Sequence, residues 1–202
     1  MRYIYVLFFM VCIGCAGDDP HLKGPILFNP SMLPGLSSEE SACVVSSLKE
    51  HVDLTILAAS GNYDSSSVFS DFMYQIEGID KALFNNISTR GGIDFTLFLP
   101  TNSAWARFLA ANPAYKELSG SQINTLVRGH LMDEAFTYEA ILRGMPHAPD
   151  MNGAIVVFEQ DVSACLLIND QATPQIVDDQ CKNGVIHVIN RVLVPENGLL
   201  GN

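Results

Sequence analysis

The chain has 202 residues, of which 48% are hydrophobic and 16% charged, a balance that suits a packed core and argues against extensive disorder. Its formal net charge is −11. Nucleic acids and anionic lipid surfaces are bound through clustered lysine and arginine, so this balance argues against both as partners.

The first 14 residues have the pattern of a signal peptide. Arg2 supplies a positive charge, and an apolar run extends from Ile4 to Ile13. Gly14 directly before Cys15 resembles the end of a bacterial lipoprotein signal, which predicts a lipid anchor on Cys15. The alternative is an ordinary secretory peptide that is cleaved shortly after Cys15. We therefore expect an outer-membrane or cell-surface lipoprotein, otherwise a secreted protein, with the lipid anchor as its membrane contact.

Residues 15–37 are expected to form a tether, because prolines and glycines interrupt them and their apolar residues show no period. Ser37 and Glu40 have capping-box spacing, which predicts a helix that begins at Ser37 or Ser38 and includes Leu48. A helical or irregular piece is expected at 54–59, and helices are expected at 68–76 and 79–84 from apolar residues at helical spacing.

The stretch 95–105 predicts a strand followed by a helix. Phe95–Leu99 is too short for a globular helix and rich in aromatics, which favours a buried strand. Pro100 ends the strand because it has no N–H to donate. Thr101 or Asn102 can cap a helix that begins near Ser103.

The second half of the chain predicts helices first and strands later. Residues 103–130 look helical in pieces, broken at Asn112-Pro113 and restarted by Ser121. Strands are expected at 155–158, 164–168 and 176–177, and after the turn Asn183-Gly184. Without alternation of single strands and helices, this order indicates an α+β fold.

Two of these stretches resemble the paired signature segments of the fasciclin-domain family. They are FTLFLPTNSAW at 95–105 and NGVIHVINRVLVP at 183–195. The resemblance implies a wedge of two small β-sheets with helices packed along one edge. The resemblance extends more weakly over residues 53–196. We expect a single domain over 38–196, followed by a polar and glycine-containing tail at 197–202. Thr101 and His187 would then link the core strands, with Phe95 in the same structural core.

His130 corresponds to the middle segment of the family. In animal matrix members an adjacent Tyr-His there is tied to integrin binding, but this chain has Gly129-His130. Integrin recognition is therefore not carried over. His130 and His187 are expected to be buried, with each ring hydrogen-bonded.

Acidic and histidine side chains near the middle of the chain suggest a divalent-metal site, which would draw on His130, Asp133, Glu134, His147 and Asp150. No H-E-x-x-H pattern or Cys/His ligand spacing accompanies them, so we expect no metal and no other cofactor. The sequence also lacks G-x-S-x-G, S-x-x-K and phosphate-loop motifs, so no catalytic residue is assigned and we expect no enzyme. A hydrolase with a triad assembled from distant residues is a third hypothesis.

Cys43, Cys165 and Cys181 follow the leader. We expect a Cys165–Cys181 disulfide, with three free thiols as the alternative and an intermolecular bridge possible if Cys43 is exposed. Asn86 begins an Asn-Ile-Ser sequon, which would be glycosylated only in a eukaryotic secretory route.

The expected function is a non-catalytic extracytoplasmic module for cell adhesion or for recognition of a surface protein or glycan. Met145 and Met151, in the loop 143–153, are the candidate partner surface. The alternative is an envelope lipoprotein that binds a small ligand or assists an enzyme or transport assembly. A deep apolar pocket with a few polar groups would favour that alternative.

Overall fold

The structure is a computed structural model that describes residues 46–47, 51–75, 95–144, 147–161 and 165–194. Several of the expected features lie outside these residues, namely the leader with Cys15, the tether, Cys43, the helix at 79–84, Asn86, Met145 and the tail. In the part of the chain that is described, no helix is both long enough and apolar enough to span a bilayer.

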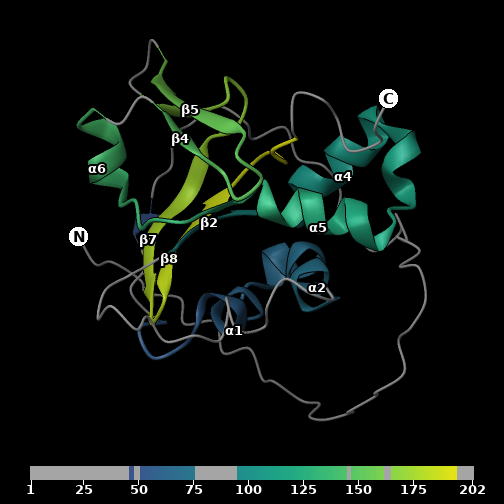
Figure 1. Ribbon diagram of the computed structural model, residues 1–202, viewed down its shortest axis with the longest axis horizontal. Coiled ribbons are helices and arrows are strands. Elements are labelled where there is room, and N and C mark those ends of the chain that lie inside the picture. Colours follow the sequence, from purple (N-terminus) through teal and green to yellow (C-terminus); the bar gives the residue numbers. More distant parts are fainter. Residues whose placement is uncertain (1–45, 48–50, 76–94, 145–146, 162–164, 195–202) are drawn as a thin grey trace, which may run out of the picture.

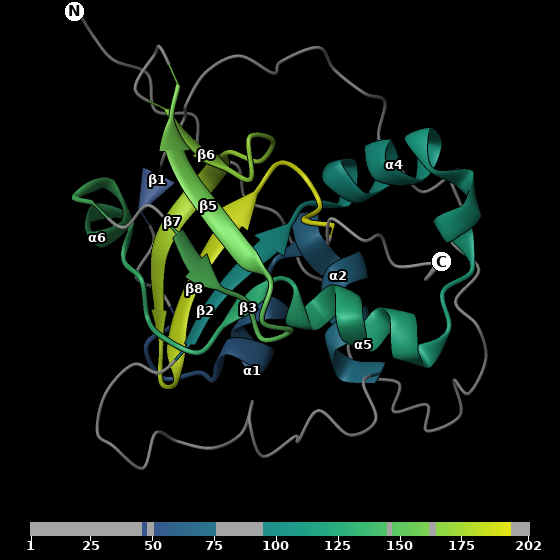
Figure 2. The same ribbon diagram turned by 45° about the horizontal axis from the view of Figure 1, so that its top comes forward.

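Two β-sheets pack on each other, and one of them carries helices on its opposite face (Figures 1 and 2). The larger sheet has the order β1-β7-β8-β2-β3 and the smaller β4-β5-β6. The strands are β1 (Ser46–Ser47), β2 (Phe95–Pro100), β3 (Leu131–Met132), β4 (His147–Pro149), β5 (Ile155–Gln160), β6 (Leu166–Ile168), β7 (Pro174–Cys181) and β8 (Gly184–Ile189). The helices are α1 (Ile56–Ser60), η2 (Asp64–Ser66), α2 (Ser67–Gln75), α4 (Asn102–Ala111), η3 (Pro113–Lys116), α5 (Gly120–Arg128) and α6 (Tyr138–Leu142).

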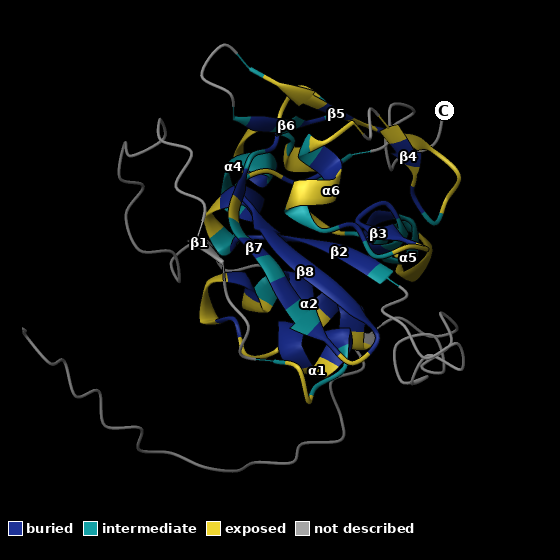
Figure 3. Ribbon diagram, turned by 90° about the vertical axis from the view of Figure 1, so that its left-hand side faces the viewer, coloured by how far each residue is buried: buried dark blue, intermediate teal, exposed yellow. Residues whose placement is uncertain are grey.

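The two signature stretches become neighbouring central strands. β2 and β8 are parallel, with a register that runs from Phe95 opposite Gly184 to Pro100 opposite Ile189. Every residue of β8 is buried, and Figure 3 shows this strand in the middle of the molecule. A parallel pair covered on both faces explains why both stretches are apolar without alternation.

The alternation of side chains along β2 and β8 divides the core into two clusters. Leu97 and Leu99 from β2, with Ile186 and Val188 from β8, face the cluster formed with α1, α2, α4 and α5. Side chains that point the other way enter the cluster with the small sheet and α6, and they include Phe98 and Ile189. The expected wedge of two sheets with helices along one side is therefore confirmed as an α+β architecture.

The start of α4 shows how the signature sequence stops a strand and begins a helix. Pro100 is the last residue of β2, and the Thr101 side chain accepts a hydrogen bond from the Ala104 N–H. Of the two N-caps that the sequence allowed, Thr101 and Asn102, the structure has Thr101. The next helix, α5, begins two residues earlier than expected, because Ser119 and Gln122 form a capping box in place of Ser121.

The predicted helix through Leu48 is wrong at Ser46–Ser47. These two residues form β1, which pairs in parallel with Ile176 and Val177 of β7. Tertiary pairing overrides the local pattern, since serine has little preference for a helix interior. The sequence also missed β3, β4 and α6, all of which lie between residues 131 and 149.

A buried carboxylate on β7 is hydrogen-bonded to one residue before α1 and one residue after it. Asp179 has no exposed surface, and its Oδ2 accepts hydrogen bonds from His51 Nδ1 and Tyr63 Oη, both at 2.6 Å. Nearby, the Asn183 side chain accepts from the Ile56 N–H at 2.8 Å. These contacts fix α1 against the end of the β7-β8 hairpin.

Close packing against Gly184 gives a direct test of this arrangement. A Cβ at residue 184 would lie 2.1 Å from Ile56 Cδ1 and 2.4 Å from the Phe95 carbonyl oxygen. Gly184→Ala should therefore lower the free energy of unfolding by about 1–3 kcal/mol or more, measured by urea denaturation. Gly120→Ala is the matched control, because a Cβ there meets nothing within 4 Å, and it should change stability by less than about 0.5 kcal/mol. Equal losses for the two variants would contradict the packing.

Candidate functional site

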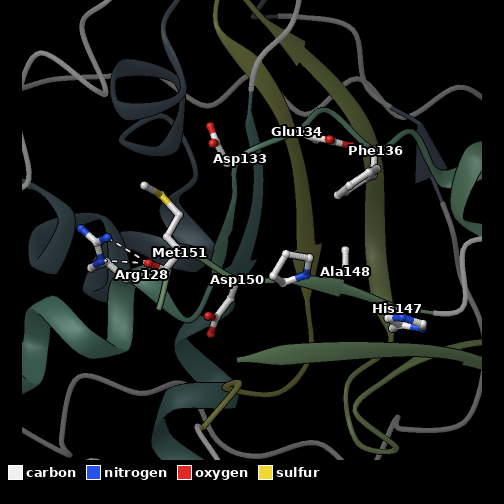
Figure 4. A pocket seen from close by; sticks show the side chains of 9 residues that line it. Arg128, Asp133, Glu134, Phe136, His147, Ala148, Asp150 and Met151 are labelled. Atoms are coloured by element: carbon white, nitrogen blue, oxygen red, sulfur yellow. Dashed lines mark hydrogen bonds between the residues drawn. The ribbon is translucent and has the colours of Figure 1, made fainter. Parts of the chain in front are cut away.

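A pocket of about 580 Å³ opens between the end of α5, the segment after β3 and strand β4 (Figure 4). The residues that line it are Arg128, Asp133, Glu134, Phe136, His147, Ala148, Pro149, Asp150 and Met151. Its volume is in the range of small-ligand and side-chain binding sites.

One wall of the pocket is held by a threonine inside the core. Thr96, on β2, is fully buried. Its Oγ1 donates to the Glu134 carbonyl at 2.7 Å and accepts from the Phe136 N–H at 2.8 Å. A buried hydroxyl needs such partners, and here they are main-chain groups of the pocket wall. Thr96 therefore positions Glu134 and Phe136.

His187, on β8, holds the same wall from the neighbouring strand. Its Nδ1 accepts from the Asp178 N–H at 3.3 Å, so Nε2 carries the proton and donates to the Phe136 carbonyl at 2.8 Å. Burial lowers the pKa of this ring, which keeps it neutral. Both main-chain groups of Phe136 are thus bonded to the core.

The opposite wall is a tight turn organised by Asp150. Its Oδ1 accepts from the N–H groups of Asn152 and Ala154, at 2.8 and 2.9 Å. Gly153 closes the turn with a φ of 82°, a conformation that suits glycine. Arg128 adds a link from α5, because its Nε and Nη2 both donate to the Met151 carbonyl. Figure 4 draws these two bonds as dashed lines.

The pocket gathers four of the five residues considered for a metal site. Asp133, Glu134, His147 and Asp150 all line it, whereas His130 is buried elsewhere. Within the described ranges, no group of three or more His, Cys, Asp or Glu side chains could hold a metal ion. Arg128 forms no ion pair with a pocket carboxylate in the same ranges.

His130 is a structural histidine in the helical layer. The Leu193 N–H donates to its Nε2 at 2.9 Å, so Nδ1 carries the proton and donates to the Leu126 carbonyl at 2.8 Å. Its ring lies 4.6 Å from that of Phe69, measured between centroids. The expected burial and hydrogen bonding of both histidines are confirmed.

Two signature residues differ from their expected roles. The Thr101 N–H does bond to the Ile189 carbonyl at 3.0 Å, but its side chain caps α4 instead of joining strands. Thr96 is the threonine whose side chain makes the long-range links. Phe95 is only partly buried, at the edge of the helical cluster.

The expected Cys165–Cys181 disulfide is wrong. Cys181 is a free, buried thiol, whereas Cys165 is disulfide-bonded. The sequence argument favoured the shortest loop, but Cys181 lies at the end of β7 among the side chains of the helical cluster. Cys181 is therefore enclosed by core side chains, and a short loop is not sufficient for two cysteines to meet.

The sequence analysis missed Thr96 and Phe136 as site residues. A signal for Thr96 existed, because a threonine inside a buried strand must have a hydrogen-bond partner. No comparable signal marks Phe136, since its importance lies in main-chain bonds to residues 40 and 51 positions away.

The histidine at position 130 should make stability depend on pH. Burial lowers its pKa from 6.5 to about 4, so the unfolded chain binds a proton here that the folded chain does not. Its contribution is complete above pH 6.5 and is lost as the pH falls toward 4, by at most about 1.4 kcal/mol per pH unit. Urea denaturation from pH 7.5 to 4.5 should show this slope, reduced in His130→Gln. An unchanged slope in the variant would contradict it.

The Cys181 thiol should be inert in the folded protein. Burial and then the charge of Asp179 raise its pKa to about 12. Iodoacetamide at pH 8 should leave Cys181 unmodified until urea unfolds the chain, as read by peptide mass spectrometry. Alkylation of Cys181 under native conditions would refute the assignment.

Three comparisons with known proteins identify this fold. Residues 67–195 match the profile of the Fasciclin domain. A stretch of 134 residues is 26% identical to human Periostin, and it covers 66% of this chain but only 15% of Periostin. A solved FAS1 domain pair from the insect cell adhesion molecule fasciclin I shares the fold, with a TM-score of 0.57 and 18% identity over 74% of this chain and 53% of that one. The chain belongs to the fasciclin-domain family.

Proposed function

We propose that this chain is a non-catalytic, extracytoplasmic recognition module that binds a protein or glycan at a cell surface. Its family membership supports this role, because the fold is shared with an insect cell adhesion molecule. The signal-peptide pattern at residues 1–14 supports export, with Cys15 as the proposed lipid anchor.

The observation that carries the proposal is the rigid attachment of the pocket wall to the core. The main chain of Phe136 is bonded on one side to Thr96 and on the other to His187, and both of these side chains are buried. A binding surface that is already ordered loses little conformational entropy when a partner docks. The pocket is therefore the place where partner contacts should contribute most.

Met151 takes part in this site. Its side chain is partly buried against the helical cluster and also lines the pocket, while its N–H donates to the Leu131 carbonyl at 2.9 Å. Methionine adapts its shape to different partners, which suits a recognition surface. Met145, the other residue of the expected surface, lies outside the described residues, and we propose that it contributes to binding as well.

Binding of a small ligand is the second candidate, and the pocket volume of about 580 Å³ favours it. The lining does not match a deep apolar cavity, because charged side chains stand around it, including Asp133, Glu134 and Arg128. A docked side chain of a larger partner fits a half-open, charged pocket better than a fully enclosed metabolite does.

The test uses the full chain, labelled and added to cells of its source that lack the protein. Saturable binding is expected by flow cytometry, and Met151→Ser should weaken it at least fivefold, which corresponds to about 1 kcal/mol. Val52→Ser is the matched control, since Val52 is an exposed apolar residue (51%) outside the pocket. It should bind like the wild type.

Thermal melting should show that Met151→Ser remains folded under the assay conditions. Unchanged surface binding of this folded variant would reject the pocket as the recognition site. A low-molecular-weight compound that copurifies with the wild type and is lost in Met151→Ser, as seen by native mass spectrometry, would instead favour the small-ligand candidate.

A further inference from the structure

We propose that the pocket between α5 and β4 binds an organic cation, namely a guanidinium or ammonium group at the end of an aliphatic chain, such as an arginine or lysine side chain of a protein partner. This inference rests on the proposed function, because it names the chemical group that the recognition site accepts.

The first support is the charge around the pocket. Asp133 and Glu134 stand on one side of it and Asp150 on the other (Figure 4). Arg128 is the cationic residue of the lining, and its Nε and Nη2 are both directed at the Met151 carbonyl. No ion pair joins Arg128 to these carboxylates in the described ranges, so three carboxylates and one guanidinium line the pocket, and these four groups sum to a negative charge. A positively charged ligand group would be attracted.

The second support is the carboxylate of Asp150, which is only 7% exposed. Its Oδ1 accepts two main-chain N–H groups of the turn, but among the described residues no donor reaches Oδ2. Gly129 lies beside that oxygen, because a Cβ at residue 129 would be 3.5 Å from it, and the missing side chain leaves it uncovered. Oδ2 is therefore the oxygen that can accept a ligand N–H group, and a hydrogen bond to a charged acceptor is a strong one.

The third support separates an organic cation from a metal ion. The carboxylates lie around a wide pocket, and no set of three in the described ranges converges as metal ligands do. Apolar side chains stand between them, from Phe136, Ala148 and Met151. An aliphatic chain would contact these groups while its charged end meets the carboxylates, as lysine and arginine side chains do elsewhere.

The experiment titrates the full chain with capped amino acids and follows amide signals by NMR. Nα-acetyl-arginine methylamide and Nα-acetyl-lysine methylamide should shift the amide signals of Phe136 and Met151. Nα-acetyl-citrulline methylamide is the control ligand, because it keeps the shape of arginine without the charge. It should bind at least tenfold more weakly, and citrulline binding as tight as arginine would overturn the proposal.

Asp150→Asn tests the same contact from the protein side. Asparagine keeps an Oδ1 acceptor for the turn and removes the charge, so arginine binding should weaken at least tenfold. Asp53→Asn is the matched control, since Asp53 is exposed and does not line the pocket, and it should leave binding unchanged. If Asp150→Asn fails to fold, the double variant Asp133→Asn, Glu134→Gln gives the same test, and unaltered arginine binding would overturn the proposal.

A final measurement distinguishes a protein side chain from a free small cation as the ligand. It also distinguishes failure of this inference from failure of the proposed function. Agmatine, a free guanidinium compound, should bind more weakly than an arginine-containing peptide if the partner is a protein; equal binding assigns the pocket to a free small cation. Absence of cation binding, with surface binding still weakened by Met151→Ser, overturns this inference and leaves the proposed function standing. Cation binding without any effect of Met151→Ser on surface binding rejects the pocket as the site of surface recognition.

Discussion

The parallel pairing of β2 with β8 is the contact on which the rest of the molecule depends. It brings Phe95 opposite Gly184, so most of the described domain lies in the connection between two adjacent strands. A pair with such separation is favourable only when both faces are covered, since closing a long loop costs entropy. The helices cover one face and the small sheet the other. Folding should therefore be slow and cooperative for a domain of this size.

The same pairing holds one wall of the pocket. Because side chains alternate along a strand, Thr96 and His187 point to the face that carries the small sheet. There they bond to the main chain of Glu134 and Phe136, which would otherwise leave buried polar groups unsatisfied. A buried N–H or carbonyl without a partner costs about 1–3 kcal/mol, so these bonds fix the wall firmly. Hydrogen bonds from these two buried side chains thus fix the position of the backbone that forms the pocket wall.

Local sequence was enough to predict the elements whose signals are local. The aromatic run at 95–99, the cap at Thr101 and the break at Asn112-Pro113 all depend on neighbouring residues, and the structure has them. Ser46–Ser47, β3 and β4 are strands of two or three residues that exist only because of a partner strand, so no periodicity could reveal them. The free thiol of Cys181 and the structural role of Phe136 were not predicted, and the reason is the same for both: each depends on contacts with distant parts of the chain. The burial of His130 was predicted from the sequence, whereas no local signal indicated that Asp150 is largely buried in the lining of a pocket.

The pocket wall can keep its position while its side chains change. The bonds from Thr96 and His187 end on backbone atoms, so they do not depend on which side chains stand at positions 133 and 134. Those side chains are free to change charge or size at little cost to folding. A descendant of this protein could therefore exchange acidic for basic residues there and acquire a different partner while keeping its architecture intact.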